Sequence, residues 1–441
     1  MSYSMNISNW AYALRILGVG AALSLGGQAL QAANLCVNPS GTNGCTSTIG
    51  AAVASAGAGD VIRVAKGTYH EDVFVDRSVS LIGDGSTNTI IDASGLLNGI
   101  NIDGCNFDAT AGVCNPRGLA HIAVSGFTVQ NANAQGIVVT NAYDVTIFDN
   151  HVTGNDRSLA FPNCPAPGFP VYFIAGEGFD CGEAIHLSGV DHSVVVNNVV
   201  DSNAGGILLS DDTGQTHDNL ISANLVQNNP FDCGITLASH NINAFYTPPP
   251  PGVFNNRIVG NTSSANGLSS GEGAGVGIFA AAPGAQNYGN TVSGNTLTGN
   301  ALPGVAMHSH APGQVLKDHV IVDNQISGNG SDGDLGTGLP TMGISITNYP
   351  PAPVAAITGI VISQNTFKDE GLDIAVNTSV GSDVSAHFNS FLDAVGIDNL
   401  GSGSISATTN WWKCSAGPGA KGCSATSGSN ITTNPWLTSP F

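Results

Sequence analysis

Short alternations of apolar and polar residues, each starting at a glycine, recur along the middle of the chain. Examples begin at Gly206 (GILLS), Gly234 (GITLA), Gly275 (GVGIF), Gly304 (GVAMH) and Gly343 (GISIT). A period of two is typical of β-strands, because successive strand side chains point to opposite faces. We therefore expect the first and third residues after each glycine to fill an interior, and the second, fourth and sixth to face solvent.

Each unit closes with a segment that we predict to be a second strand carrying two asparagines. A repeat of fixed length predicts a solenoid, and its strand-like alternation predicts an all-β parallel β-helix. Turns stacked about 4.8 Å apart place matching asparagines above one another, where their amides can bond along the stack. We interpret the asparagines as structural. The pairs are Asn150/Asn155, Asn198/Asn203, Asn224/Asn229, Asn261/Asn266, Asn295/Asn300 and Asn324/Asn329.

Both ends of the repeat are predicted to carry caps, because a solenoid otherwise exposes an apolar end. Residues 46–58 predict an amphipathic helix with Ile49, Val53 and Ala56 on one stripe. The C-terminal segment gains tryptophans that we expect to cover the other end, with sugar binding as the alternative. The predicted boundaries are a signal peptide at 1–32, an N-terminal cap at 33–60, the β-helix at 61–405 and a C-terminal cap, bearing a disulfide, at 406–441.

Residues 59–85 (GDVIRVAKGTYHEDVFVDRSVSLIGDG) and later repeats such as 321–330 (IVDNQISGNG) resemble one superfamily. This is the right-handed parallel β-helix group of pectate lyases, pectin methylesterases and NosD-type periplasmic proteins. The resemblance implies a right-handed β-helix over nearly all of the mature chain. It implies no single activity, because this scaffold carries many chemistries and binding roles. The sequence lacks the Gly-Arg-Pro-Trp segment of the methylesterases and the Gly-His-Gly and Arg-x-Lys segments of polygalacturonases.

The composition narrows the expected partners. Of the 441 residues only 10% are charged, and the net charge is −20. Nucleic acids and acidic membrane surfaces both attract clustered Lys and Arg, so neither is an expected partner. We expect a monomer.

The N-terminus is typical of a secretory signal peptide. Arg15 precedes an apolar run at 16–25, and cleavage is expected after Ala29 or Ala32. The mature protein is then secreted or periplasmic, without membrane insertion. Eight of nine cysteines form close pairs that suit such an oxidising compartment. The ninth, Cys233, is either a buried thiol or a competitor of Cys181 for Cys164. The pairs are Cys36/Cys45, Cys105/Cys114, Cys164/Cys181 and Cys414/Cys423.

Aligning the units on their glycines predicts columns of outward-facing side chains. Neighbours in a column should lie about 5 Å apart. Further carboxylates precede the opening position in three of the turns. The fourth-position column is Ser210, Ala238, Phe279, His308 and Thr347, and the sixth-position column is Asp212, His240, Ala281, His310 and Tyr349.

This face predicts a catalytic groove. Stacked carboxylates can hydrolyse glycosidic bonds, and a carboxylate beside a histidine can abstract a sugar-ring proton. Asp212 beside His240 is the sharpest such pair. Two insertions, 157–180 and 241–254, are expected to form the rim. The candidate catalytic residues are Glu183, His186, Asp211, Asp212, Asp232, His240 and Glu272.

Metal binding is the rival use of the same face. His308 and His310 lie two residues apart on one strand and share a face, which suits Zn or Cu, and NosD-type relatives are associated with copper. We expect Ca²⁺ ahead of Cu or Zn as a cofactor, because uronic-acid chemistry needs a cation and the middle turns offer few basic residues.

We therefore expect a secreted protein that binds a polysaccharide and cleaves or modifies it as a lyase, hydrolase or epimerase. The alternative is a non-catalytic periplasmic or surface binding protein, including a NosD-like copper binder. Whether the chain is an enzyme stays open from the sequence.

Overall fold

The computed structural model describes residues 32–108, 113–156, 182–240, 252–281, 283–310, 313–348 and 356–440. The chain divides into two units, Met1–Ala32 and Ala33–Phe441, and every described helix and strand belongs to the second. The predicted signal peptide up to residue 31, the insertion 157–180, most of the insertion 241–254 and Tyr349 lie outside the described residues.

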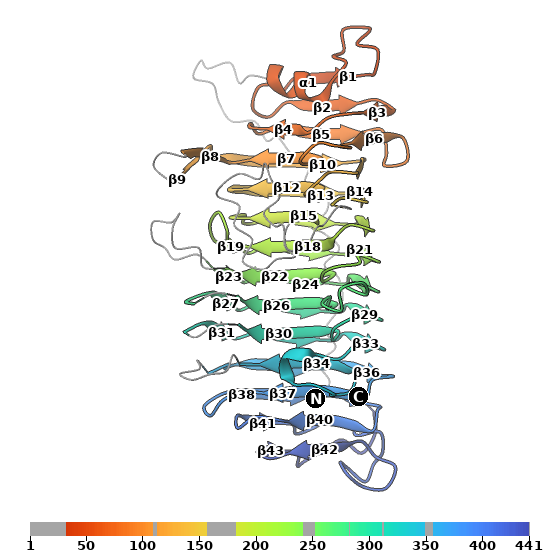
Figure 1. The fold of residues 1–441 in the computed structure, drawn as a ribbon, viewed down its shortest axis with the longest axis vertical. Helices are drawn as coiled ribbons and strands as arrows, with labels where there is room; N and C mark the ends of the chain where they lie inside the picture. Colours follow the sequence, from red (N-terminus) through yellow and green to blue (C-terminus); the bar gives the residue numbers. More distant parts are fainter. Residues whose placement is uncertain are drawn as a thin grey trace, which may run out of the picture. The chain divides into compact units, whose positions relative to one another are not determined.

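Three long parallel sheets run along the second unit, and successive turns of the chain add strands to each of them in order (Figure 1). A four-stranded sheet lies beside them from β19 (Thr216–His217) to β31 (Val315–Lys317), with β23 (Val253–Phe254) and β27 (Gln286–Tyr288) between. One antiparallel hairpin, β8 (Cys105–Asp108) and β9 (Val113–Pro116), projects from the stack. The predicted parallel β-helix is confirmed.

The strands of each long sheet follow in order of their stacking. The first sheet contains β1 (Asn34–Val37), β2 (Val61–Val64), β5 (Ser80–Gly83), β10 (Leu119–Ser125), β13 (Ala142–Phe148), β16 (Val194–Val196), β20 (Leu220–Ser222), β24 (Arg257–Val259), β28 (Thr291–Ser293), β32 (Val320–Val322), β35 (Ile360–Ser363), β38 (Asp383–His387), β41 (Ser404–Ser406) and β43 (Ile431–Thr432). The second contains β3 (Gly67–Tyr69), β6 (Thr89–Asp92), β11 (Thr128–Gln130), β14 (His151–Thr153), β17 (Val199–Asp201), β21 (Leu225–Gln227), β25 (Thr262–Ser264), β29 (Thr296–Thr298), β33 (Gln325–Ser327), β36 (Thr366–Lys368) and β39 (Ser390–Phe391). The third contains β4 (Val73–Val75), β7 (Ile100–Asp103), β12 (Ile137–Thr140), β15 (Glu183–Ser188), β18 (Gly205–Ser210), β22 (Ile235–Ser239), β26 (Val276–Ala280), β30 (Val305–Ser309), β34 (Met342–Thr347), β37 (Leu372–Asn377), β40 (Val395–Asn399) and β42 (Ala425–Gly428).

The glycine-started strands are those of the third sheet, and their alternation places apolar side chains inside the coil. Ile207 and Leu209 stack in register on Ile235 and Leu237 of the next turn, and all four are fully buried. They belong to a continuous apolar core that extends from Val37 to Trp412. The interior positions predicted from the alternation are confirmed.

The asparagines form buried ladders, as predicted. Asn224 shows the pattern: its backbone N–H and its Nδ2 both donate to Oδ1 of Asn261, at 3.0 Å, while its Oδ1 accepts the same two bonds from Asn198. Its Nδ2 also donates to the carbonyl oxygen of Val195. Each amide therefore satisfies backbone groups that the corner would otherwise leave unpaired in the interior.

The expectation of one second strand per turn is wrong. Each segment with an asparagine pair forms two short strands in different sheets, for example β20 and β21, and the asparagines lie at the corners. The residue before the ladder asparagine has a left-handed backbone, as in Ala223 (φ 53°) before Asn224 and Gly294 (φ 65°) before Asn295. This conformation turns the chain sharply and separates the two strands.

A helix closes the N-terminal end of the stack, whereas the predicted C-terminal cap, 406–441, still adds β42 and β43 to the third and first sheets. The helix α1 spans Ile49–Ser55, shorter than the predicted 46–58, and begins after Thr48, whose hydroxyl accepts from the backbone N–H of Ala51. At the other end Trp412 is fully buried and packs against Phe391, which supports the capping interpretation for this residue.

Disulfides tie down both ends. The predicted bonds Cys36–Cys45 and Cys414–Cys423 are present, and Cys233 is a buried free thiol. The other two predicted pairs involve Cys114, Cys164 and Cys181, whose side chains lie outside the described part.

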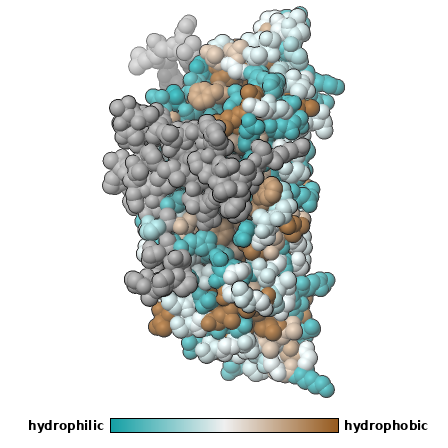
Figure 2. All heavy atoms as spheres, in the orientation of Figure 1, coloured by the Kyte–Doolittle hydropathy of each residue, from teal (hydrophilic) through white to brown (hydrophobic). Residues whose placement is uncertain are grey.

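The described surface in view is mainly hydrophilic or intermediate, with separate hydrophobic patches (Figure 2). Among the described residues, no helix is long and apolar enough to cross a membrane.

Candidate functional site

The outer face of the third sheet is buried, which contradicts the expectation that it faces solvent. Leu208, Ser210 and Asp212, at the second, fourth and sixth positions after Gly206, are at most 1% exposed. Residues from the corners before the strands complete a second apolar cluster with this face. Strand alternation predicts which side chains point into the coil and which point outward, but it does not predict that corner residues cover outward-pointing side chains. The cluster contains Leu208, Cys233, Ala238, Ala274, Phe279, Leu302 and Ala306.

Four polar side chains form one hydrogen-bonded chain at the carboxyl ends of β15, β18 and β22. His186 Nε2 lies 2.7 Å from Ser210 Oγ, which donates to Asp212 Oδ2 at 2.6 Å. Asp212 Oδ1 lies 2.8 Å from His240 Nδ1. The predicted contact between Asp212 and His240 is therefore present, and His186 joins it through a serine. All four side chains are buried.

Burial and mutual charge set the protonation of this network. Burial lowers the pKa of His186 to about 4, so its imidazole is neutral at pH 7. Burial alone would raise the pKa of Asp212, but the charge and hydrogen bond of His240 outweigh it and lower that pKa. Burial raises the pKa of Asp211 to about 6. Asp211 accepts from the hydroxyl of Ser239 and the backbone N–H of His240, so it holds the strand end together.

The remaining predicted carboxylates lie at the other end of the strands, where β15, β22 and β26 begin. Glu183 pairs in register with Gly205, seven residues before Asp212, a separation of roughly 20 Å along a strand. Glu183 and Asp232 are buried, and Glu272 is exposed. Burial raises the pKa of the Cys233 thiol, and the charges of Asp232 and Glu183 raise it further. The structure thus divides the predicted catalytic residues into two groups.

A second cluster on the same sheet combines His308 and His310 with Asp334. His308 Nδ1 lies 3.2 Å from His310 Nε2 and 3.2 Å from Asp334 Oδ2, and His310 Nε2 lies 3.1 Å from the same carboxylate oxygen. Three potential ligand atoms therefore form a nearly equilateral triangle. His308 is buried on β30, while the side chains of His310 and Asp334 are 28% and 54% exposed.

A further carboxylate holds the other side of the His308 ring. Asp332 Oδ2 lies 2.6 Å from His308 Nε2, and the Ser345 hydroxyl lies 3.5 Å from the same nitrogen. Burial would lower the pKa of His308, but the hydrogen bonds of Asp332 and Asp334 outweigh it and raise that pKa. The hydrogen bonds from His308 and His310 hold the pKa of Asp334 far below its usual range.

The two carboxylates of this cluster are the residues that the sequence did not reveal. They come from the polar loop 331–342, where Asp332 caps the short 3₁₀ helix η1 (Gly333–Leu335) by accepting from the backbone N–H of Asp334 at 2.9 Å. The signal in the sequence is the Ser-Asp-Gly-Asp run in this loop. This run lies beside His308 of the preceding turn because successive turns stack on one another.

Comparisons with known proteins agree with the β-helix fold. A sequence model of the family described as "Periplasmic copper-binding protein (NosD)" matches residues 70–271. That stretch supplies strands to all three stacked parallel sheets. The chain is a parallel β-helix protein. No curated protein sequence matches the chain.

Two solved structures share this β-helix architecture. The Dettilon tailspike protein gp208 has 14% sequence identity and a TM-score of 0.54, with coverage of 89% of this chain and 66% of that chain. The catalytic unit of the GH87 α-1,3-glucanase from Streptomyces thermodiastaticus strain HF3-3 has 13% identity and a TM-score of 0.50, with 88% and 65% coverage. The β-helix thus spans about two thirds of each, and identities this low establish fold alone.

Proposed function

We propose that the protein binds a divalent transition metal, Cu²⁺ ahead of Zn²⁺, through His308, His310 and Asp334. The observation that carries this proposal is the triangle of ligand atoms with edges of 3.1–3.2 Å. A tetrahedral Zn²⁺ about 2.1 Å from each ligand needs ligand atoms about 3.4 Å apart, and a tetragonal Cu²⁺ needs adjacent ligand atoms closer together, so small side-chain shifts suffice for either ion. Two imidazoles and a carboxylate suit Cu²⁺ or Zn²⁺, whereas Ca²⁺ takes oxygen ligands.

Asp332 supports the site by holding the His308 ring from the side opposite the proposed metal position. Its carboxylate accepts a hydrogen bond from His308 Nε2, which leaves Nδ1 of the same ring to face the metal position. Metal-bound histidines in proteins usually donate their other N–H to a carboxylate or carbonyl, which fixes the tautomer and the ring orientation. The side chains of His310 and Asp334 are 28% and 54% exposed, so both ligands border solvent.

The family match supports the proposal at the level of the protein class. Its description names periplasmic copper binding, but the matched residues end at 271, before His308. A secreted or periplasmic location fits the signal-like N-terminus and the disulfides at both ends of the stack.

Calorimetric titration of the metal-free mature protein with Cu²⁺ and Zn²⁺ tests the proposal. We expect saturable binding that His308→Asn and Asp334→Asn each weaken by at least about tenfold. His151→Asn is the matched control, because His151 also faces a carboxylate, Asp201, at 3.1 Å, but among the described residues it belongs to no group of three potential metal ligands. Unchanged binding in both site variants would overturn the assignment.

A polysaccharide-modifying activity is the second candidate. The hydrogen-bonded chain from His186 to His240 favours it, because a carboxylate beside a histidine can act in acid–base catalysis on a sugar ring. The burial of this network requires a movement that exposes it before a polymer can bind. Screening neutral and acidic polysaccharides for new reducing ends and ultraviolet absorbance tests this candidate. Activity that disappears in Asp212→Ala and His240→Ala would support it, and silence across the panel would remove a hydrolase or a lyase.

A further inference from the structure

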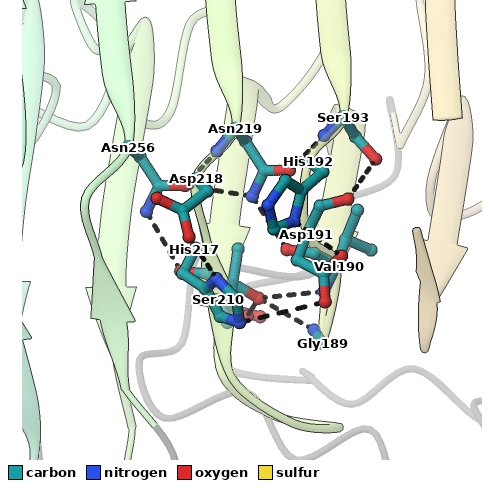
Figure 3. Close-up of polar contacts among 11 residues, drawn as sticks. Gly189, Val190, Asp191, His192, Ser193, Ser210, His217, Asp218, Asn219 and Asn256 are labelled. Atoms are coloured by element: carbon teal, nitrogen blue, oxygen red, sulfur yellow. Dashed lines mark hydrogen bonds and ion pairs between the residues drawn. The ribbon is translucent and has the colours of Figure 1, made fainter. Parts of the chain in front are cut away.

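Four ionisable side chains from two successive turns converge at a corner remote in sequence from His308 (Figure 3). Asp218 Oδ2 lies 2.8 Å from His217 Nδ1, and Asp191 Oδ2 lies 3.8 Å from His217 Nε2. Asp191 Oδ1 lies 3.2 Å from His192 Nδ1. Ligand atoms of His192, His217 and Asp218 all lie within 4.8 Å of one another.

The backbone beneath these side chains is fixed by the ladder at that corner. Asp191 and His217 are bridged as parallel neighbours, and the His192 N–H donates to the His217 carbonyl at 3.3 Å. Asn219 accepts from the backbone N–H of Ser193 at 2.9 Å, and the Ser193 hydroxyl donates to the Asp191 carbonyl at 2.9 Å. The corner therefore presents its side chains from a rigid frame.

Stacking fixes the plane of the His217 ring. The ring lies nearly parallel to Phe254, with 4.7 Å between centroids, and Phe254 stacks in turn on Tyr288 at 4.8 Å. One face of the imidazole is thereby covered, while its two nitrogens point toward Asp218 and Asp191. This is the orientation that a metal ligand requires, with one nitrogen toward the ion and the other toward a carboxylate.

We propose that His192, His217 and Asp218 form a second, weaker site for a divalent transition metal, with Asp191 as its supporting carboxylate. Two imidazoles and two carboxylates combine the donors that Zn²⁺ and Cu²⁺ favour with a local negative charge. His192 and Asp218 are 66% and 41% exposed, so they lose more side-chain freedom on binding than the buried His308 does. The affinity is therefore lower than at His308.

The test is a Zn²⁺ titration by equilibrium dialysis with elemental analysis, repeated with Co²⁺ as a spectroscopic probe. The full mature chain should bind about two ions, one more tightly than the other. The double variant His192→Asn/Asp218→Asn should lose the weaker ion, and His308→Asn the tighter one. Asparagine is tolerated at both corner positions because His192 (φ 50°) and Asp218 (φ 56°) are left-handed.

The matched control is His121→Asn/Asp144→Asn. These residues also have left-handed backbones, φ 55° and 51°, and form an exposed histidine–aspartate pair that, in the described part of the chain, joins no group of three potential metal ligands. The control should keep both ions. A wild type that binds one ion, lost in His308→Asn, overturns the second site and leaves the proposed function intact. One ion lost only in the corner variant supports the second site and overturns the assignment to His308. Equal loss in the control overturns the second site, because surface charge alone would explain the binding.

Discussion

Two buried histidines of the third sheet show how neighbouring groups decide the chemistry of a residue. His186 has a serine hydroxyl at 2.7 Å and Asp212 Oδ2 at 3.9 Å, and burial lowers its pKa to about 4. His308 is also buried, but Asp332 and Asp334 raise its pKa. The first imidazole is therefore neutral at pH 7. At His308, a proton competes with the metal ion for Nδ1.

This difference predicts that metal binding weakens in acid. The raised pKa of His308 means that its Nδ1 carries a proton below that pKa, and a metal ion must displace this proton. We expect the affinity for Zn²⁺ to fall as the pH decreases from about 8 to about 5.5. Calorimetry in buffers of different ionisation enthalpy measures both the affinity and the proton released. A pH-independent affinity would contradict the role of His308.

Asp332→Asn should weaken Zn²⁺ binding by roughly 10- to 100-fold without unfolding the loop. The substitution removes the anion facing His308 Nε2, yet the amide oxygen can still accept from the Asp334 N–H and cap η1. Asp323→Asn, at an exposed corner, is the control. Equal affinities in the two variants would show that Asp332 does not position the ring.

Glu370 ends one asparagine ladder, and its ionisation should make the free energy of unfolding depend on pH. Its carboxylate accepts from the backbone N–H and Nδ2 of Asn329, and burial raises its pKa from 4.5 to about 7. Between these values the unfolded chain releases a proton that the folded chain keeps, so the free energy of unfolding falls as pH rises.

Glu370→Gln removes that ionisation and retains an amide oxygen for the ladder. The variant should exceed the wild type in stability by up to about 3 kcal/mol at pH 8 and differ little at pH 4. Thermal unfolding at both pH values measures the effect. A variant that is less stable than the wild type at pH 8 would contradict the raised pKa.

At the scale of elements, the ladders turn a short repeat into a rigid stack. Asn229 donates from its backbone N–H and Nδ2 to Asn266, while it accepts both bonds from Asn203. Its neighbour Asn228 is exposed and left-handed, with φ 56°. Adjacent asparagines therefore have different roles, one in the ladder and one in the turn.

Asn229→Ala should lower the melting temperature much more than Asn228→Gly. The first change removes the partner of the buried Asn203 backbone N–H and breaks the amide bonds to Asn203 and Asn266, at a cost of about 3 kcal/mol. The second keeps a residue that tolerates positive φ. Thermal unfolding followed by circular dichroism compares them, and equal shifts would argue against the ladder as a source of stability.

The sequence predicted those parts of the fold that each turn determines locally. Glycine-started alternations identified strands such as β18, and recurring asparagine pairs identified the ladders. Alignment of the turns on their glycines identified the contact between Asp212 and His240. Burial of outward positions such as Leu208 and Ala238 was not predictable, because it depends on how corners such as that of Cys233 pack across turns. Asp334 was missed for the same reason, since it comes from a loop one turn away from His308.

For the whole molecule, the caps decide whether an elongated core is protected at its ends. Trp412 is fully buried, with its ring centroid 4.7 Å from that of Phe391. Trp412→Ala should lower the free energy of unfolding by about 3–5 kcal/mol, because it leaves a large cavity. Trp436→Ala, at a residue 36% exposed, should cost far less. Similar losses of stability in both variants, seen by thermal unfolding, would contradict a capping role for Trp412.

The central claim is that the third sheet holds a metal ion at His308, His310 and Asp334. Crystals of the mature protein grown with Zn²⁺, measured on both sides of the zinc absorption edge, test it most directly. We expect an anomalous peak about 2.1 Å from His308 Nδ1, His310 Nε2 and Asp334 Oδ2. Saturating Zn²⁺ with no anomalous peak among these three residues would contradict it.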